Sequence, residues 1–219
     1  MLINKFDIKD QDKLEKIDLR YSTFRIMKLQ EHPIVDGQWD LKHLQKIHQS
    51  IFQDVYPFAG KIRTEQIGKG NFRFASPLYI ESEAARVFKE LKMEQYLTGL
   101  HKSALCERMA YYFSEVNVLH PFREGNGRTE REFLRTLALK NGYTLDFKKM
   151  SRSELLRASE RSVMNAGVMV SLFQQAILED MPNPVLLRRW EHFSTKATYE
   201  LPERLKRQRR SNKGKGFER

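Results

Sequence analysis

Two glycines, Gly125 and Gly127, lie in the middle of the chain, just before an apolar run with helical spacing. Residues without a Cβ let the backbone approach a ligand closely, and the first N–H groups of a helix have no intrahelical acceptor. Together with the helix dipole, these groups predict a site for an anion. Arg128 and Arg131 follow at a spacing of three, so both project from one face of the first helical turns. Two guanidinium groups beside a helix N-terminus suit a polyphosphate better than a single carboxylate.

Two further side chains add chemistry beside this anion site. Glu124 supplies a carboxylate, the kind of ligand that holds Mg²⁺ together with substrate phosphates. His120 titrates near neutral pH and is suited to take a proton from an attacking nucleophile. A base, a metal ligand, a phosphate site and paired arginines therefore lie within residues 120–131. This combination predicts the transfer of a phosphate group from a nucleotide.

The elements that must position this segment have apolar residues at helical spacing. Leu105, Met109, Phe113 and Val116 form one such stripe, directly before the segment. After the segment a helix is expected to end at the signal Asn141-Gly142. The expected helices are 41–52 capped by Asp40, 82–93 capped by Ser82, 103–119, 126–140, 153–164 opened by Ser153, 168–178 and 186–193. The predicted fold class is mostly α.

One stretch, residues 60–77, departs from the helical pattern. Apolar and polar residues alternate on both sides of a glycine turn, which predicts a β-hairpin. The residues are Ile62, Arg63 and Thr64 before the turn Gly68-Lys69-Gly70, with Phe72 and Phe74 after it. An exposed hairpin edge can pair with an extended segment of another protein.

The positive charge is concentrated at one end of the chain. The 219 residues carry a net charge of +11, of which +7 lies in residues 204–219. That segment has no apolar period, so we expect a disordered tail, and the pI of 9.7 mostly describes it. Such a tail can bind nucleic acid through phosphates or serve only as a solvated linker.

Composition excludes collagen, a disulfide scaffold and a wholly disordered chain. A single cysteine, Cys106, indicates a reducing compartment and is expected to be a small buried residue. No apolar run is long enough for a membrane span, and the charged first residues do not resemble a signal peptide. We therefore expect no membrane association and a cytoplasmic protein.

The segment also resembles a known signature. Residues 120–131, HPFREGNGRTER, meet every fixed position of the Fic family motif HPFx[D/E]GN[G/K]RxxR. The resemblance extends to LKHLQKIHQSIFQDVYPFAGKIR at 41–63 and covers roughly residues 20–180. It implies a helical domain with a hairpin flap over the motif loop, and the expected limits are an N-terminal extension at 1–20, a Fic domain at 21–185, a C-terminal helix at 186–203 and the tail.

The resemblance implies transfer of AMP from ATP to a Ser, Thr or Tyr hydroxyl of a target protein. His120 would deprotonate that hydroxyl, and Glu124 would hold Mg²⁺ between the α- and β-phosphates. Asn126 and the N–H groups of Gly125 and Gly127 would neutralise charge on the α-phosphate.

The remaining implied roles concern the triphosphate, the loop and the target. Arg128 would contact the β-phosphate and Arg131 the γ-phosphate, while Phe122 would anchor the loop in the core. The flap residues Ile67, Gly68, Lys69 and Gly70 would clamp the target segment. The family's kinase-like branch, represented by Doc, has Lys where Gly127 stands here, so the glycine favours AMP transfer; phosphocholine transfer remains open.

Regulation is inferred from an absence. Fic proteins are often inhibited by a helix with the motif [S/T]xxxE[G/N], whose glutamate pairs with the second motif arginine, here Arg131. This sequence has no such motif. It therefore resembles toxins that a separate small antitoxin inhibits, and related stand-alone members often modify type II topoisomerases.

Three points stay open at this stage. One alternative is a fragment of an effector secreted into a host cell, and another is a basic nucleic-acid-binding protein with a vestigial phosphate site. Adenine-pocket residues cannot be fixed, although Asn165 is a candidate. His48 is expected to be a hydrogen-bonded core residue and not a catalytic one.

Overall fold

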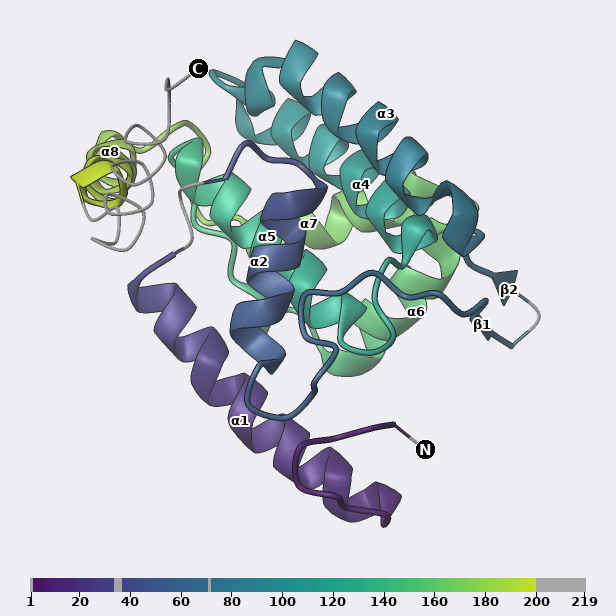
Figure 1. Ribbon diagram of the computed structural model, residues 1–219. Coiled ribbons are helices and arrows are strands. Elements are labelled where there is room, and N and C mark those ends of the chain that lie inside the picture. Colours follow the sequence, from purple (N-terminus) through teal and green to yellow (C-terminus); the bar gives the residue numbers. More distant parts are fainter. Residues whose placement is uncertain (1, 34–36, 71, 200–219) are drawn as a thin grey trace, which may run out of the picture.

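The computed structural model describes residues 2–33, 37–70 and 72–199, with side chains up to residue 194. It is mostly helical with one small hairpin, which confirms the predicted fold class. The helices are α1 Gln11–Glu31, α2 Leu41–Phe52, α3 Ile80–Met93, α4 Lys102–Leu119, α5 Asn126–Lys140, α6 Arg152–Ser162, α7 Val170–Ala176 and α8 Pro184–Tyr199, and the strands are β1 Gly68–Lys69 and β2 Phe72–Arg73 (Figure 1).

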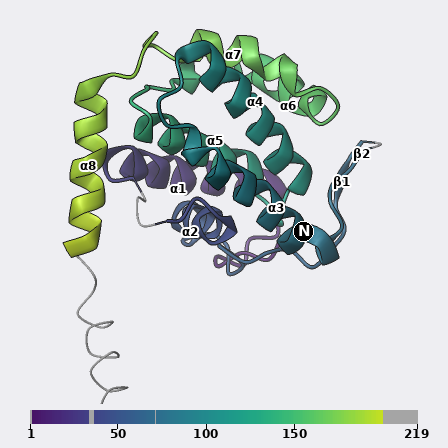
Figure 2. The same cartoon turned by 90° about the horizontal axis from the view of Figure 1, so that it is seen from above.

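Helix α4 lies at the centre of the fold. It packs against α3, α5, α6 and α7, while α5 also packs against α2 and α8. The predicted stripe Leu105, Met109, Phe113 and Val116 is buried along its length, and Cys106 is buried on the same helix. The hairpin and α8 lie at opposite ends of the molecule (Figure 2).

The helix ends follow local capping chemistry, which the sequence predicted in part. Asp40 caps α2 by accepting a hydrogen bond from the His43 backbone N–H at 2.8 Å, and Gly142 follows α5 with φ +80°. Two expected caps are wrong. Helix α3 begins at Ile80, directly after a 3₁₀ turn, so Ser82 lies inside it. Helix α6 is capped by Ser151 and not by Ser153, because Ser151 forms a capping box with Glu154.

The N-terminal helix spans one of the expected domain limits. Helix α1 runs without a break across the boundary placed between residues 20 and 21. Its inner face, with Leu14, Asp18, Ser22 and Leu29, is buried, and α1 packs on α2. The expected boundary at 185/186 likewise falls in the first turn of α8. Residues 204–219 lie outside the described part of the chain.

The hairpin is shorter and starts later than expected. Gly68 pairs with Arg73 and Lys69 with Phe72 in an antiparallel register. Residues 62–64 form no strand, because Arg63 is buried and turns inward to hydrogen-bond the chain beneath it. None of the helices in the described ranges combines the length and apolar character that a bilayer crossing requires.

Candidate active site

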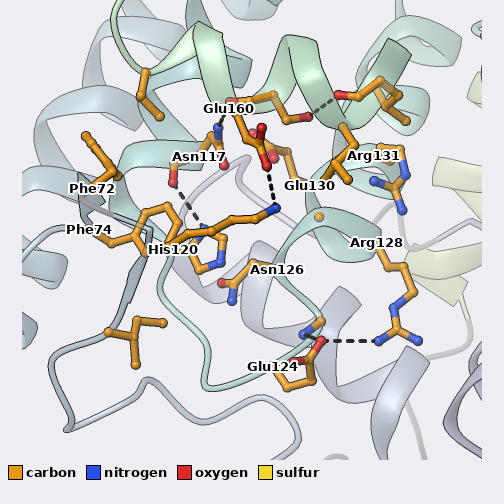
Figure 3. Close-up of a pocket in the computed structure, with 18 of the residues that line it drawn as sticks. Phe72, Phe74, Asn117, His120, Glu124, Asn126, Arg128, Glu130, Arg131 and Glu160 are labelled. Carbon is orange, nitrogen blue, oxygen red and sulfur yellow. Dashed lines mark hydrogen bonds and ion pairs between the residues drawn. The ribbon is translucent and has the colours of Figure 1, made fainter. Parts of the chain in front are cut away.

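A pocket of about 1240 Å³ lies between the hairpin, the loop that precedes α5, and α6 (Figure 3). Segments far apart in the sequence meet at its wall. The predicted site residues that line it are Ile67, Gly68, Lys69, Gly70, His120, Glu124, Gly125, Asn126, Gly127, Arg128 and Arg131. Phe122 lies beneath the loop, fully buried.

His120 ends α4 in a left-handed conformation, with φ +43°, and its ring stacks on Phe74 at 3.7 Å between centroids. Its Nδ1 lies 3.2 Å from the Asn117 carbonyl oxygen. This contact assigns the proton to Nδ1 and leaves the Nε2 lone pair as the basic atom. Burial lowers the pKa of His120 to about 4, so the imidazole is neutral at pH 7.

Arg63 holds the backbone around His120. It is buried, and its guanidinium donates to the carbonyls of His120 at 2.7 Å and Ala75 at 2.6 Å. Its backbone N–H donates to Pro121 at 2.9 Å. Burial also lowers the pKa of Arg63. This role of Arg63 could not be predicted from the sequence, because all its acceptors are backbone carbonyls, which leave no sequence pattern.

The shape of the loop before α5 depends on Gly125 and Asn126, which other residues could not replace without disturbing it. Gly125 has φ +84°, and a Cβ there would lie 2.3 Å from the Phe52 ring. Asn126 is buried, and its amide both accepts from the Phe122 N–H at 2.8 Å and donates to the Phe122 carbonyl at 2.7 Å. These two hydrogen bonds shape the loop, and the expected role of Asn126 at the α-phosphate stays a prediction.

His48 supports the same loop from below. Its Nδ1 accepts the Gly60 N–H at 2.8 Å, so its Nε2 donates to the Glu124 carbonyl at 2.9 Å. The ring stacks on Phe122 at 3.9 Å, and burial lowers its pKa to about 4. His48 is a hydrogen-bonded core histidine, as expected.

The start of α5 presents the predicted anion site. Within the described chain, no acceptor lies in hydrogen-bond reach of the backbone N–H groups of Asn126, Gly127 and Arg128. The N–H of Gly125 differs, because it donates to the Glu124 carboxylate at 2.9 Å. Three free N–H groups at the positive end of a helix favour an anion.

Arg128 is tied to α1, which the sequence did not predict. Its guanidinium forms a two-point ion pair with Asp18 at 2.7 and 2.9 Å and donates to the Ser22 hydroxyl at 2.8 Å. A longer contact of 3.5 Å reaches Glu124. These contacts occupy both terminal nitrogens, so only Nε–H is uncommitted for the β-phosphate contact that was expected. Asp18 and Arg128 are 110 positions apart, which explains why no local pattern revealed the pair.

Arg131 differs from Arg128 in its ion-pair partners. Among the described residues, no carboxylate lies within 4 Å of its guanidinium, and burial lowers its pKa. Its Nη1 would lie 3.1 Å from a Cβ built on Gly127. A larger side chain at position 127 would therefore crowd this arginine, which agrees with an open site at this glycine.

The hairpin is joined to the opposite wall of the pocket. The Nζ of Lys69 forms an ion pair with the Glu160 carboxylate on α6 at 2.9 Å (Figure 3). Both side chains are about half exposed, so this single surface pair contributes little stability. It connects the hairpin to α6 across the pocket.

The apolar part of the pocket lining comes from residues that the sequence analysis did not predict. Asn165 is exposed, caps its own turn by accepting the Gly167 N–H at 2.9 Å, and does not line the pocket. The candidate assignment to Asn165 is therefore corrected. The apolar wall instead comes from Phe147, Met150, Leu155, Leu156 and Val163.

Glu124 fits a divalent cation that is shared with a substrate. Its side chain is 42% exposed, and one oxygen is left after the contacts to Gly125 and Arg128. The described residues contain no cluster of three His, Cys, Asp or Glu ligands. A cation here would take most of its ligands from phosphates and water, which is the usual pattern for Mg²⁺.

Comparisons with known proteins agree with this geometry. The model of the Fic/DOC family matches residues 38–138. The adenylyltransferase VbhT of Bartonella schoenbuchensis is 41% identical over 82% of this chain, which spans only 37% of that protein's length. The probable protein adenylyltransferase Fic of Escherichia coli is 35% identical over 74% of this chain and 79% of its own length.

Solved structures give the same result. The BepC effector of Bartonella tribocorum, with bound AMPPNP, has 26% identity and a TM-score of 0.73 over 81% of this chain and 92% of that one. An N-terminal Fic domain from Bartonella quintana, with bound ADP, has 25% identity and a TM-score of 0.76 over 86% and 94%. The chain therefore belongs to the Fic/DOC family, as its motif suggested.

Proposed function

We propose that this chain is a protein adenylyltransferase that moves AMP from ATP to a Ser, Thr or Tyr hydroxyl of a target protein. The observation that carries the proposal is the convergence on one pocket of a neutral histidine, a helix N-terminus with free N–H groups and an arginine without a carboxylate partner among the described residues. The activity in the names of relatives such as the Fic protein of Escherichia coli supports it. The alternatives of a nucleic-acid-binding protein and an effector fragment are not favoured.

In this mechanism His120 is the base. Its Nε2 takes the proton of the target hydroxyl, and the oxygen forms a bond to the α-phosphorus of ATP. The bond between that phosphorus and the bridging oxygen breaks, and pyrophosphate leaves. Because Nδ1–H is held by the Asn117 carbonyl, the ring keeps the orientation and tautomer that this step needs.

The start of α5 stabilises the negative charge of the transferred group. The N–H groups of residues 126–128 would face the phosphates, and the buried Asn126 amide keeps the loop in that shape. Arg131, free of carboxylates in the described structure, would bind the γ-phosphate, and Arg128 would contribute its Nε–H and its charge to the β-phosphate.

Glu124 is the residue that would hold Mg²⁺. When bound, the cation neutralises phosphate charge and favours departure of pyrophosphate. The carboxylate is accessible and keeps one oxygen without a partner, which supports this assignment.

The flap residues Ile67, Gly68, Lys69 and Gly70 would bind the target segment. The hairpin has only two strands, so its outer edge is available to an extended segment by strand addition. A segment bound there would pass over the pocket that His120 lines, with its hydroxyl near the base.

Regulation by a separate antitoxin is part of the proposal. Arg131 has no glutamate partner in the described residues, and the chain lacks the inhibitory motif. A small antitoxin with an [S/T]xxxE[G/N] helix would place a glutamate on this arginine and exclude the γ-phosphate. In this scheme the chain is a toxin that acts in the bacterial cytoplasm, and type II topoisomerase subunits are its proposed targets by analogy with related members.

The test is incubation of the chain with a bacterial lysate and ATP labelled at the α- or, separately, the γ-phosphate. Protein should be labelled only from the α position, and addition of EDTA should stop the labelling. Labelling only from the γ position would mean a kinase. Labelling from neither position would contradict the proposal.

A further inference from the structure

A buried carboxyl that the proposed mechanism does not use lies in the wall of the pocket. Glu130 sits on α5 between the two motif arginines, is 4% exposed and lines the pocket. Figure 3 shows it between Asn117 and Arg131, toward α6. Its Oε1 is sealed from solvent and has no hydrogen-bond partner. Buried polar atoms without partners are rare in native proteins, so this one calls for an explanation.

The burial of Glu130 favours its uncharged form. Burial raises its pKa well above the ordinary value, and the only opposing charge is Arg131 on the same helix. Those two residues are adjacent, so their side chains do not face each other. Two other charged groups of the pocket are engaged in ion pairs, Lys69 with Glu160 and Arg128 with Asp18, and the lining also contains Arg123, Lys148 and Arg152. A neutral carboxyl carries both an O–H donor and a carbonyl acceptor.

The pocket has two chemically different ends. The phosphate end consists of the start of α5 and Arg131. The other part of the lining carries the apolar residues Phe147, Met150, Leu155, Leu156 and Val163, with Lys148, Arg152, Ser159 and Glu160 among them. A flat, apolar-faced base suits the second end. Glu130 is the buried polar group beside that wall, since Asn117 is already bonded to the Ser159 carbonyl.

We propose that the buried carboxyl of Glu130, which has an oxygen without a partner and lines the pocket, recognises the adenine base of the nucleotide. Each polar edge of adenine places a ring-nitrogen acceptor beside the amino donor, and a neutral carboxyl satisfies both groups at once. An ionised carboxylate would satisfy only the amino group. This inference rests on the proposed function, because it takes ATP as the ligand.

The test compares two variants with two ligands. Glu130→Gln keeps a donor and an acceptor, whereas Glu130→Met keeps the length of the side chain and removes both. We expect ATP affinity to fall about tenfold in the Met variant and to stay within about threefold of wild type in the Gln variant. Affinity for inorganic triphosphate, which has no base, should be equal in all three proteins.

A second measurement separates recognition from folding. Because Glu130→Met removes an unpartnered buried polar group, its Tm should be no lower than that of the wild type. Unchanged ATP affinity in the Met variant would overturn the inference, and so would a parallel loss of triphosphate binding, which would place Glu130 at the phosphates. A wild-type chain that binds neither ligand would overturn the proposed function, and with it this inference.

Discussion

At the scale of single residues, the site depends on side chains held in unusual protonation states or backbone conformations. His120 and His48 are both kept neutral by burial, with pKa values lowered to about 4. Glu130 is kept neutral by the same cause acting on an acid. Desolvation therefore decides the charge of three groups in or under one pocket.

The buried histidines predict a loss of stability on acidification. The unfolded chain binds a proton at each histidine near pH 6.5, whereas the folded chain binds it only near pH 4. The free energy of unfolding therefore falls as the pH drops from 6.5 toward 4, by about 2 kcal/mol per histidine between pH 7 and 5. Chemical denaturation of His48→Gln should show that much less pH dependence than the wild type.

The pH dependence that Glu130 contributes to the free energy of unfolding has the opposite sign to that of the histidines, so a Glu130 variant serves as the control. Its raised pKa means that the folded chain keeps a proton that the unfolded chain has lost above about pH 4.5. Acidification therefore favours the fold at this residue. Glu130→Gln should make the loss of stability between pH 7 and 5 steeper, and an unchanged slope would mean that the carboxyl is ionised in the folded protein.

Replacing Gly125 should destabilise the fold both by backbone strain and by a steric clash, and a second glycine allows the two contributions to be separated. Gly125→Ala combines a positive φ with a clash against Phe52, whereas Gly99→Ala has a similar φ of +79° and no atom within 4 Å. Gly99→Ala should lower the free energy of unfolding by about 1 kcal/mol and Gly125→Ala by at least about 2 kcal/mol more. Equal losses in the free energy of unfolding, measured by thermal denaturation, would show that the loop rearranges to accommodate the extra methyl group.

At the scale of elements, three segments distant in sequence hold the motif loop. Helix α2 supports it through His48, the segment before the hairpin through Arg63, and α1 through Asp18. The Tyr56 hydroxyl also donates to Asp18 at 2.9 Å. Helix α1 is thus part of the active-site scaffold and not an extension added to it.

The pair of Asp18 and Arg128 makes this role testable. Asp18→Asn keeps the shape and removes the charge, which leaves a largely buried arginine without its carboxylate. We expect a loss of about 3 kcal/mol in the free energy of unfolding. Glu15→Gln, an exposed charge change on the same helix, should cost less than about 0.5 kcal/mol. Equal losses in the free energy of unfolding for the two substitutions would show that Asp18 of α1 does not support the active-site loop.

At the scale of the whole molecule, the sequence predicted the helices with strong apolar periods and the residues of the motif. It did not predict α1 at all, because the outer face of that helix also carries apolar residues such as Leu19 and Phe24, and these obscure the helical period of its buried face. Long-range partners such as Asp18 and Arg63 have no local signal, since only the fold brings them to the loop. The hydrogen bonds of the Asn126 amide to the Phe122 backbone are local, but the motif resemblance implied a phosphate contact for this side chain and so did not reveal them.

The concentration of charge at the end of the chain gives a prediction for the intact protein. If catalysis resides in the pocket, deletion of residues 204–219 should leave automodification with α-labelled ATP within about twofold of wild type. A nucleic-acid-binding protein would instead lose most of its affinity and its salt dependence on the same deletion. A large loss of automodification would show that the tail takes part in the reaction.

The most direct test measures ATP binding and AMP transfer on one preparation of His120→Ala. The account predicts ATP affinity within about threefold of wild type and a transfer rate at least about 100-fold lower, because only the base is removed. Transfer at the wild-type rate would contradict the assignment of His120 as the base.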